Sequence, residues 1–111
     1  MKLVTAIIQP DNLDAVREEL IGAGISRITA SRCTGRGNAE AVDLYRGQQV
    51  APGLIPKVRL EIAVNQEFVQ IAIDAIVKGA RTGAVGDGKI FVTTLDEVVR
   101  IRTGETGSDA I

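Results

Sequence analysis

The stretch Thr82-Gly-Ala-Val-Gly-Asp-Gly-Lys-Ile-Phe91 places three glycines and a lysine directly before a short apolar run. Glycine has no Cβ, so the backbone N–H groups of such a loop can converge on one anion. A lysine beside the loop adds a positive charge that suits phosphate. We therefore interpret this stretch as an anion-binding loop that leads into a strand. A tight turn followed by an exposed lysine is the simpler interpretation, and a short Gly-x-Gly taken alone favours it.

Outside this stretch, the chain alternates between strand-like and helix-like patterns. Lys57–Val64 is the clearest strand, because apolar and charged residues alternate along it. The expected order is strand Leu3–Gln9, a helix that ends near Gly24, strand Ser26–Thr34, strand Lys57–Val64, helix Phe68–Val77 and strand Lys89–Thr94. This β-α-β-β-α-β order predicts an α+β, ferredoxin-like split βαβ fold, with a four-stranded antiparallel sheet and two helices on one face.

Particular residues mark the expected ends of the two helices. Asp11 precedes the first helical pattern and Asn65 precedes the second, and both residue types are common helix N-caps. Gly24 is expected to end the first helix, and Lys78-Gly79 the second.

The expected second and third strands are separated by about twenty residues, Gly35–Pro56, and so long a loop in a small domain is usually functional or disordered. It is polar and has one aromatic residue, Tyr45. We predict a mobile, solvent-projecting arm over residues 36–55, and an insertion without a role is the alternative. Together with this arm and a polar tail over residues 100–111, the chain is expected to form one domain, residues 1–111.

Composition limits the function classes. The 111 residues are 45% hydrophobic and 3% aromatic, which allows one aliphatic core. The formal net charge of −1 argues against a nucleic-acid binder that acts by bulk charge. There is no histidine, one cysteine, no nucleophile–base pair and no metal-ligand spacing, so we expect no catalytic residues and no metal site. Without a signal-peptide pattern or a membrane-spanning apolar run, we expect a cytoplasmic protein that does not insert into membranes.

Four cationic side chains near expected strand ends are candidates for an anion site: Lys57, Lys89, Arg100 and Arg102. Arg100 and Arg102 alternate around Ile101, so both point the same way if the tail is extended. Two guanidinium groups aimed at one site suit a di- or triphosphate. A bare Arg-x-Arg is more often a solvated pair of surface arginines.

Other positions allow two interpretations each. Thr29 and Glu61 lie on the polar faces of expected neighbouring strands, and they either border an adenine slot or are ordinary surface residues. Gly35-Arg-Gly37, at the root of the arm, either lets the backbone approach a ligand or acts as a hinge. Cys33 is interpreted as a small strand residue, because nothing local marks it as activated.

Several segments resemble the signature segments of the PII family of nitrogen-regulatory signalling proteins. The two most specific are Thr82–Phe91 and the tail Val99-Arg-Ile-Arg-Thr-Gly-Glu105. Ala6-Ile-Ile-Gln-Pro10, Leu44-Tyr-Arg-Gly47 and Ile55-Pro-Lys57 also match. The resemblance covers essentially the whole chain.

The resemblance implies a homotrimer of ferredoxin-like subunits, which binds ATP or ADP in each cleft between neighbours. The arm corresponds to the family's T-loop, which changes shape with the ligand and docks on target proteins. In the implied nucleotide site, the phosphates would be held by Gly86, Asp87, Gly88, Lys89, Arg100 and Arg102. The adenine would be surrounded by Ile7, Thr29, Glu61 and Ala63. The ribose and phosphates would be approached by Gly35 and Gly37. Lys57 would meet a carboxylate or a phosphate near the root of the arm.

The arm departs from the family pattern. Where many relatives have an arginine and then a glutamine that helps to bind magnesium and 2-oxoglutarate, this chain is one residue shorter and has Asn38 and Ala39. Asn38 replaces the glutamine if the gap falls just before it, and otherwise Ala39 offers no group. The tyrosine that relatives uridylylate aligns with Val50, and the arm contains no serine to phosphorylate, so we expect neither modification.

Three functions remain open on these grounds. The first is a non-enzymatic adenylate sensor that controls targets such as ammonium transporters, glutamine-synthetase regulators, transcription factors or acetyl-CoA carboxylase. The second is a divergent PII-like sensor of adenylates and a carbon signal such as bicarbonate. The third is a small phosphate-processing enzyme on the same fold, as acylphosphatases are, which the lack of histidine disfavours.

Overall fold

The computed structural model describes residues 1–37, 43–45, 48–50 and 53–111. Its elements, in chain order, are β1 (Lys2–Ile8), the 3-10 turn η1 (Pro10–Asn12), α1 (Leu13–Gly22), β2 (Thr29–Gly35), β3 (Asp43–Tyr45), β4 (Gln48–Val50), β5 (Ile55–Val64), η2 (Gln66–Phe68), α2 (Val69–Ala80), β6 (Gly88–Thr94) and η3 (Gly107–Ala110).

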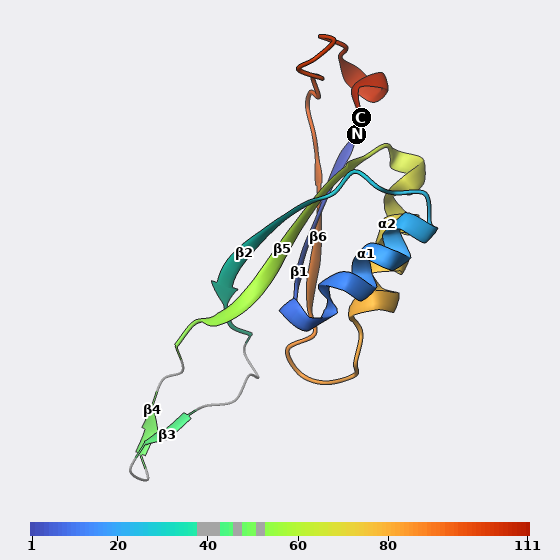
Figure 1. Cartoon of the computed structure of the whole chain (residues 1–111). Coiled ribbons are helices and arrows are strands. Elements are labelled where there is room, and N and C mark those ends of the chain that lie inside the picture. Colours follow the sequence, from blue (N-terminus) through green and yellow to red (C-terminus); the bar gives the residue numbers. More distant parts are fainter. Residues whose placement is uncertain (38–42, 46–47, 51–52) are drawn as a thin grey trace.

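Four of these strands form one antiparallel sheet in the order β2-β5-β1-β6. The first strand of the chain is therefore an inner strand, and it pairs with the two strands that come late in the sequence. α1 and α2 lie side by side on one face of this sheet (Figure 1). The predicted α+β, ferredoxin-like fold is confirmed.

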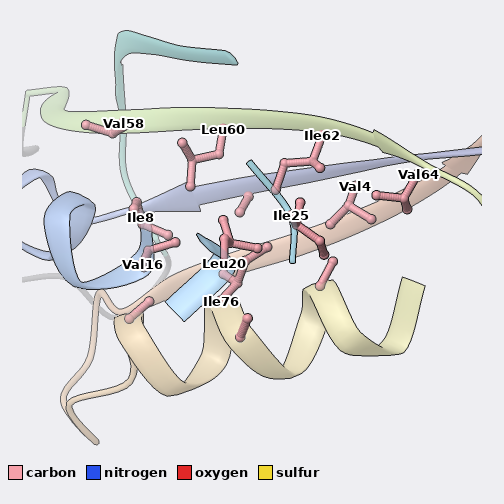
Figure 2. Close-up of a cluster of buried hydrophobic side chains, with 14 residues drawn as sticks. Val4, Ile8, Val16, Leu20, Ile25, Val58, Leu60, Ile62, Val64 and Ile76 are labelled. Carbon is pink, nitrogen blue, oxygen red and sulfur yellow. The ribbon is translucent and has the colours of Figure 1, made fainter. Parts of the chain in front are cut away.

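The core lies between the sheet and the two helices. Figure 2 shows that its side chains come from β1 and β5 on one side and from α1 and α2 on the other. The alternation along β5 explains this arrangement, because Val58, Leu60, Ile62 and Val64 all face the helices and are at most 6% exposed. In the described part of the chain no helix covers the opposite face of the sheet, and that face carries the candidate site.

The helix boundaries differ in part from the predicted ones. Neither predicted N-cap side chain makes a capping hydrogen bond: Asp11 lies within η1, and the Asn65 amide donates to the Ser108 carbonyl at 3.2 Å. The predicted stop at Gly24 is confirmed, since the N–H groups of Gly24 and Ile25 close the end of α1 onto its last carbonyls.

The second helix continues through its predicted stop. α2 includes Gly79 and ends at Ala80. A Cβ at Gly79 would lie 2.6 Å from the Val16 Cα, so this glycine is the point where α2 packs directly on the backbone of α1. The glycine therefore serves helix contact rather than helix termination.

The arm leaves the sheet between β2 and β5, where Gly35 and Ile55 are still paired. β3 and β4 form a separate two-stranded antiparallel sheet, which the sequence did not predict, and Figure 1 shows it beyond the end of the main sheet. None of the helices in the described segments has the length and apolar character that a bilayer crossing requires.

Candidate anion-binding groove

A groove of about 650 Å³ lies on the helix-free face, where β1 ends and β6 begins. It is lined by Ile7, Cys33, Thr34, Gly35, Arg36, Gly37, Lys57, Arg59, Val85, Gly86, Gly88, Lys89 and Phe91. All the charged side chains among these described lining residues are cationic, and none of them is a carboxylate. Such a lining favours an anionic ligand, because positive charges around a concave site add up to a stronger positive electrostatic potential inside it.

The sheet register places the cations of the groove. Ile7 is paired with Arg59 on β5 and with Lys89 on β6, so these side chains stand next to one another on the same face. Lys57, one alternation earlier on β5, is only 5% exposed. Sequence analysis included Lys57 and Lys89 but missed Arg59, although alternation along β5 places it on the same face as Lys57.

Arg59 already has an acidic neighbour on its own strand. Its Nε lies 3.0 Å from Oε1 of Glu61, and the two side chains are 52% and 41% exposed. An ion pair this exposed contributes at most about 1 kcal/mol to stability, so an incoming anion can compete for Arg59 at low cost.

The loop between α2 and β6 is fastened by the Asp87 carboxylate. Its oxygens accept hydrogen bonds from the Thr82 hydroxyl, from the Thr82 N–H at 2.8 Å and from the Gly83 N–H at 2.9 Å. The Thr82 hydroxyl is the largest cause of a lowered Asp87 pKa, followed by the two backbone donors and the charge of Arg81. The carboxylate of Asp87 thus closes the loop on itself, and Asp87 is not among the residues that line the groove.

A second contact ties this loop to the end of β1. The Gln9 amide Nε2 donates to the carbonyl oxygen of Gly86 at 2.7 Å, in a partly buried position. Sequence reasoning missed Gln9 as a member of the site. No sequence pattern links residues 9 and 86, because only the folded sheet brings the end of β1 to this loop.

The groove unites half of the residues expected to bind nucleotide, together with Lys57, which was expected to meet a carboxylate or a phosphate. The nucleotide-binding candidates within it are Ile7, Gly35, Gly37, Gly86, Gly88 and Lys89. Thr29 and Glu61 are paired across β2 and β5 beyond its edge, and Ala63 lines a separate cavity near Phe68 and Ile111. Asn38 lies outside the described residues.

The two tail arginines lie beyond the opposite end of β6 from Lys89 (Figure 1). The tail is not extended, so the condition under which both would point the same way is not met. The segment after Arg100 turns back, so that the Arg100 N–H donates to the Glu105 carbonyl and Val99 pairs with Thr106. The Arg100 guanidinium contacts the Glu105 carboxylate at 3.1 Å and the Asp109 and Ile111 main-chain oxygens at 3.3 Å, whereas Arg102 is exposed on the turn.

The described side chains offer no cluster of three or more His, Cys, Asp or Glu residues that could hold a metal ion. Among the groove residues that the structure describes, the only side chain with nucleophilic chemistry beyond hydroxyls and amines is Cys33, which is paired with Lys57 on the neighbouring strand. The arrangement of the described residues is therefore suited to binding an anion.

Comparisons with known proteins agree on one family. The family model described as nitrogen regulatory protein P-II matches residues 1–105. Proteins named nitrogen regulatory protein P-II from Rhizobium etli and Mesorhizobium japonicum are each 48% identical over the full length of both chains. Nitrogen regulatory protein P-II 2 from Methanothermobacter thermautotrophicus is 46% identical over the whole of this chain and 97% of its own.

Proposed function

Because the chain belongs to the nitrogen regulatory protein P-II family, we propose that it is a non-enzymatic signalling protein that binds ATP or ADP between the subunits of a homotrimer. In this proposal the bound nucleotide sets the shape of the arm, and the arm docks on target proteins. The family itself is one of nitrogen-regulatory signalling proteins. The proposal that the ligand is ATP or ADP rests on the properties of the groove.

The main observation that supports nucleotide binding is the positive charge of the groove. Arg36, Lys57, Arg59 and Lys89 line it together with the glycine backbone at residues 86 and 88, and the described lining has no carboxylate. A nucleoside di- or triphosphate brings several negative charges into one place, and guanidinium, ammonium and backbone N–H groups are the donors that such phosphates need. Val85 and Phe91 add apolar surface to the same groove.

The division of the expected site supports binding between subunits. Within one chain, Arg102 lies at the far end of β6 from Lys89, and Thr29 lies outside the groove. One subunit therefore does not present all the expected contacts to a single ligand. In a closed ring, the surface around Lys89 of one subunit can face the surface around Thr29 and Arg102 of the next, which completes the site three times.

Binding without turnover is the simplest use of these groups. The described groove residues include cations, glycines and apolar side chains, and no histidine or carboxylate stands beside a nucleophile there. Phosphoryl transfer would require a group that orients an attacking nucleophile. We therefore propose that the nucleotide acts as an effector, with Mg²⁺ and 2-oxoglutarate or bicarbonate as candidate further ligands near Lys57 and Asn38.

Titration calorimetry with ATP and ADP tests this function, each with and without Mg²⁺ and 2-oxoglutarate or bicarbonate. Light scattering on the same samples measures the oligomer. We expect a stable trimer that binds either nucleotide with no release of phosphate over the course of the titration. A stable monomer, or a trimer without heat of binding for either nucleotide, would contradict the proposal, and steady phosphate release would instead indicate the phosphate-processing enzyme.

A further inference from the structure

The contact between Gln9 and Gly86 gives Gln9 a role that neither the family resemblance nor the composition of the groove assigns. We propose that Gln9 is a positioning residue, which holds the Gly86–Asp87 peptide in the orientation that the groove needs in order to accept phosphate. The inference rests on the proposed nucleotide binding and concerns how this chain prepares its own site for it.

The hydrogen bond fixes the direction of a whole peptide group. The Gln9 Nε2 donates to the Gly86 oxygen at 2.7 Å. All peptide bonds in the described chain are trans, so the N–H of Asp87 points the opposite way from that oxygen. By holding the oxygen of Gly86, the side chain of Gln9 therefore also sets where the N–H of Asp87 points.

Without this anchor the peptide can rotate at its glycine end. Reversal of the Gly86–Asp87 peptide changes ψ of Gly86 together with φ of Asp87, and Gly86 has no Cβ to resist its part of that rotation. Gln9 is not among the residues that line the groove, so the Gly86 oxygen is held by a partner outside it, and a reversed peptide would no longer keep that oxygen there. A carbonyl oxygen carries a partial negative charge and repels an anion where an N–H would bind it.

Other contacts leave this one peptide unrestrained. Asp87 binds Thr82 and Gly83 through its side chain, which ties the start of the loop to its end. Gly88 enters β6, where it pairs with Ile8. Among the hydrogen bonds of the described residues, the contact from Gln9 is the one that reaches the Gly86 carbonyl from outside the loop.

The test compares two substitutions of the same kind. Gln9→Met keeps the length of the side chain and removes the donor. Gln70→Met is the matched control, because Gln70 donates to Asp74 at 2.8 Å on the exposed surface of α2, away from the groove. Each variant is purified as the full chain and titrated with ATP, ADP and adenosine, and its thermal unfolding is recorded.

We expect Gln9→Met to weaken ATP and ADP binding by roughly five- to tenfold, the scale of one lost hydrogen bond, and to leave adenosine binding unchanged. In the protein without nucleotide, the amide resonance of Asp87 should shift in Gln9→Met and stay in place in Gln70→Met. The phosphate-specific loss distinguishes positioning of this loop from a general loss of structure, which would weaken all three ligands alike.

Each contrary result has a separate meaning. Wild-type protein that binds ATP, together with a Gln9→Met variant that binds it equally well, overturns the role of Gln9 and leaves the proposed function standing. An equal loss for adenosine, or an unmoved Asp87 amide, also overturns it. Wild-type protein that binds none of the nucleotides removes the proposed function, and the positioning role of Gln9 falls with it.

Discussion

The carbonyl oxygen of Ile7 occupies the space that a side chain on Gly88 would need, since a Cβ built there would lie 1.8 Å from that oxygen. The two residues belong to the paired strands β1 and β6, and Gly88 has a φ of 115°. Both the steric contact and the backbone conformation therefore require glycine where the loop enters β6.

Substitution of Gly88 by alanine should cost at least about 2 kcal/mol of unfolding free energy, because the β1–β6 pairing has to open to admit a methyl group. Chemical denaturation measures this loss. Gly83→Ala is the control, since Gly83 also has a positive φ but has open space around its Cβ position, and it should cost only about 1 kcal/mol. Equal losses of unfolding free energy in the two variants would mean that the close contact with Ile7 adds nothing to the cost of the Gly88 substitution.

The crossing of the two helices gives a second stability prediction. Gly79→Ala should lower the free energy of unfolding by roughly 1–3 kcal/mol, because the new Cβ overlaps the backbone of Val16 and forces α1 and α2 apart. Gly22→Ala in α1 meets nothing within 4 Å, and it should raise stability by about 0.4–1 kcal/mol through the unfolded chain. Urea unfolding of both variants checks the opposite signs.

The loop at Asp87 gives a prediction in pH. Its pKa lies below the ordinary value of 3.8, mainly because the Thr82 hydroxyl donates to the carboxylate. A carboxylate with a lower pKa in the folded state contributes stability above pH 3.8 and loses that contribution as the pH falls through the folded pKa. Thr82→Val should therefore bring the pKa of Asp87 back up toward 3.8. NMR titration of the Asp87 carboxyl carbon checks this, and an unchanged pKa in the variant would contradict the assigned cause.

The proposed inter-subunit site predicts complementation. Lys89→Ala and Arg102→Ala should each weaken ATP binding by roughly 1–3 kcal/mol, the scale of a charge-assisted contact. When the two variants are mixed, denatured together and refolded, some clefts receive Lys89 from one subunit and Arg102 from its neighbour. About a quarter of the clefts should then bind with wild-type affinity. If both residues act within one subunit, mixing restores no tight site.

Much of the fold follows from the sequence, because a strand or helix that buries one face has apolar residues at a regular spacing along the chain. The alternation of β5 and the helical spacing before Gly24 predict their elements correctly, since each buries one side on a single aliphatic core. Gly79 shows the limit of such reasoning. From the sequence alone, a glycine that ends a helix cannot be distinguished from a glycine that allows a second helix to pack closely against the first. Only the packing of α1 decides between these uses.

The candidate site was predictable to the extent that it is made of strand faces. Alternation along β5 places Lys57 on the polar face of the sheet, and the register of β5, β1 and β6 then brings it into the same groove as Lys89. The conformation of the tail was left open by the sequence, because the alternation of Arg100 and Arg102 does not reveal the hydrogen bonds between Arg100 and Glu105 that turn the chain back. Gln9 was missed because its partner lies 77 residues away, and a single hydrogen bond between distant segments leaves no periodic signal.

The central place of β1 has a consequence for synthesis of the chain. β1 is translated before both of its partners, which span Ile55–Val64 and Gly88–Thr94. While the ribosome makes the first half of the protein, this apolar segment has no strand to pair with, and its edges stay open to unwanted association. Folding of the sheet is therefore expected to wait until nearly all of the polypeptide has emerged, which makes the nascent chain a natural client for chaperones that bind extended apolar segments.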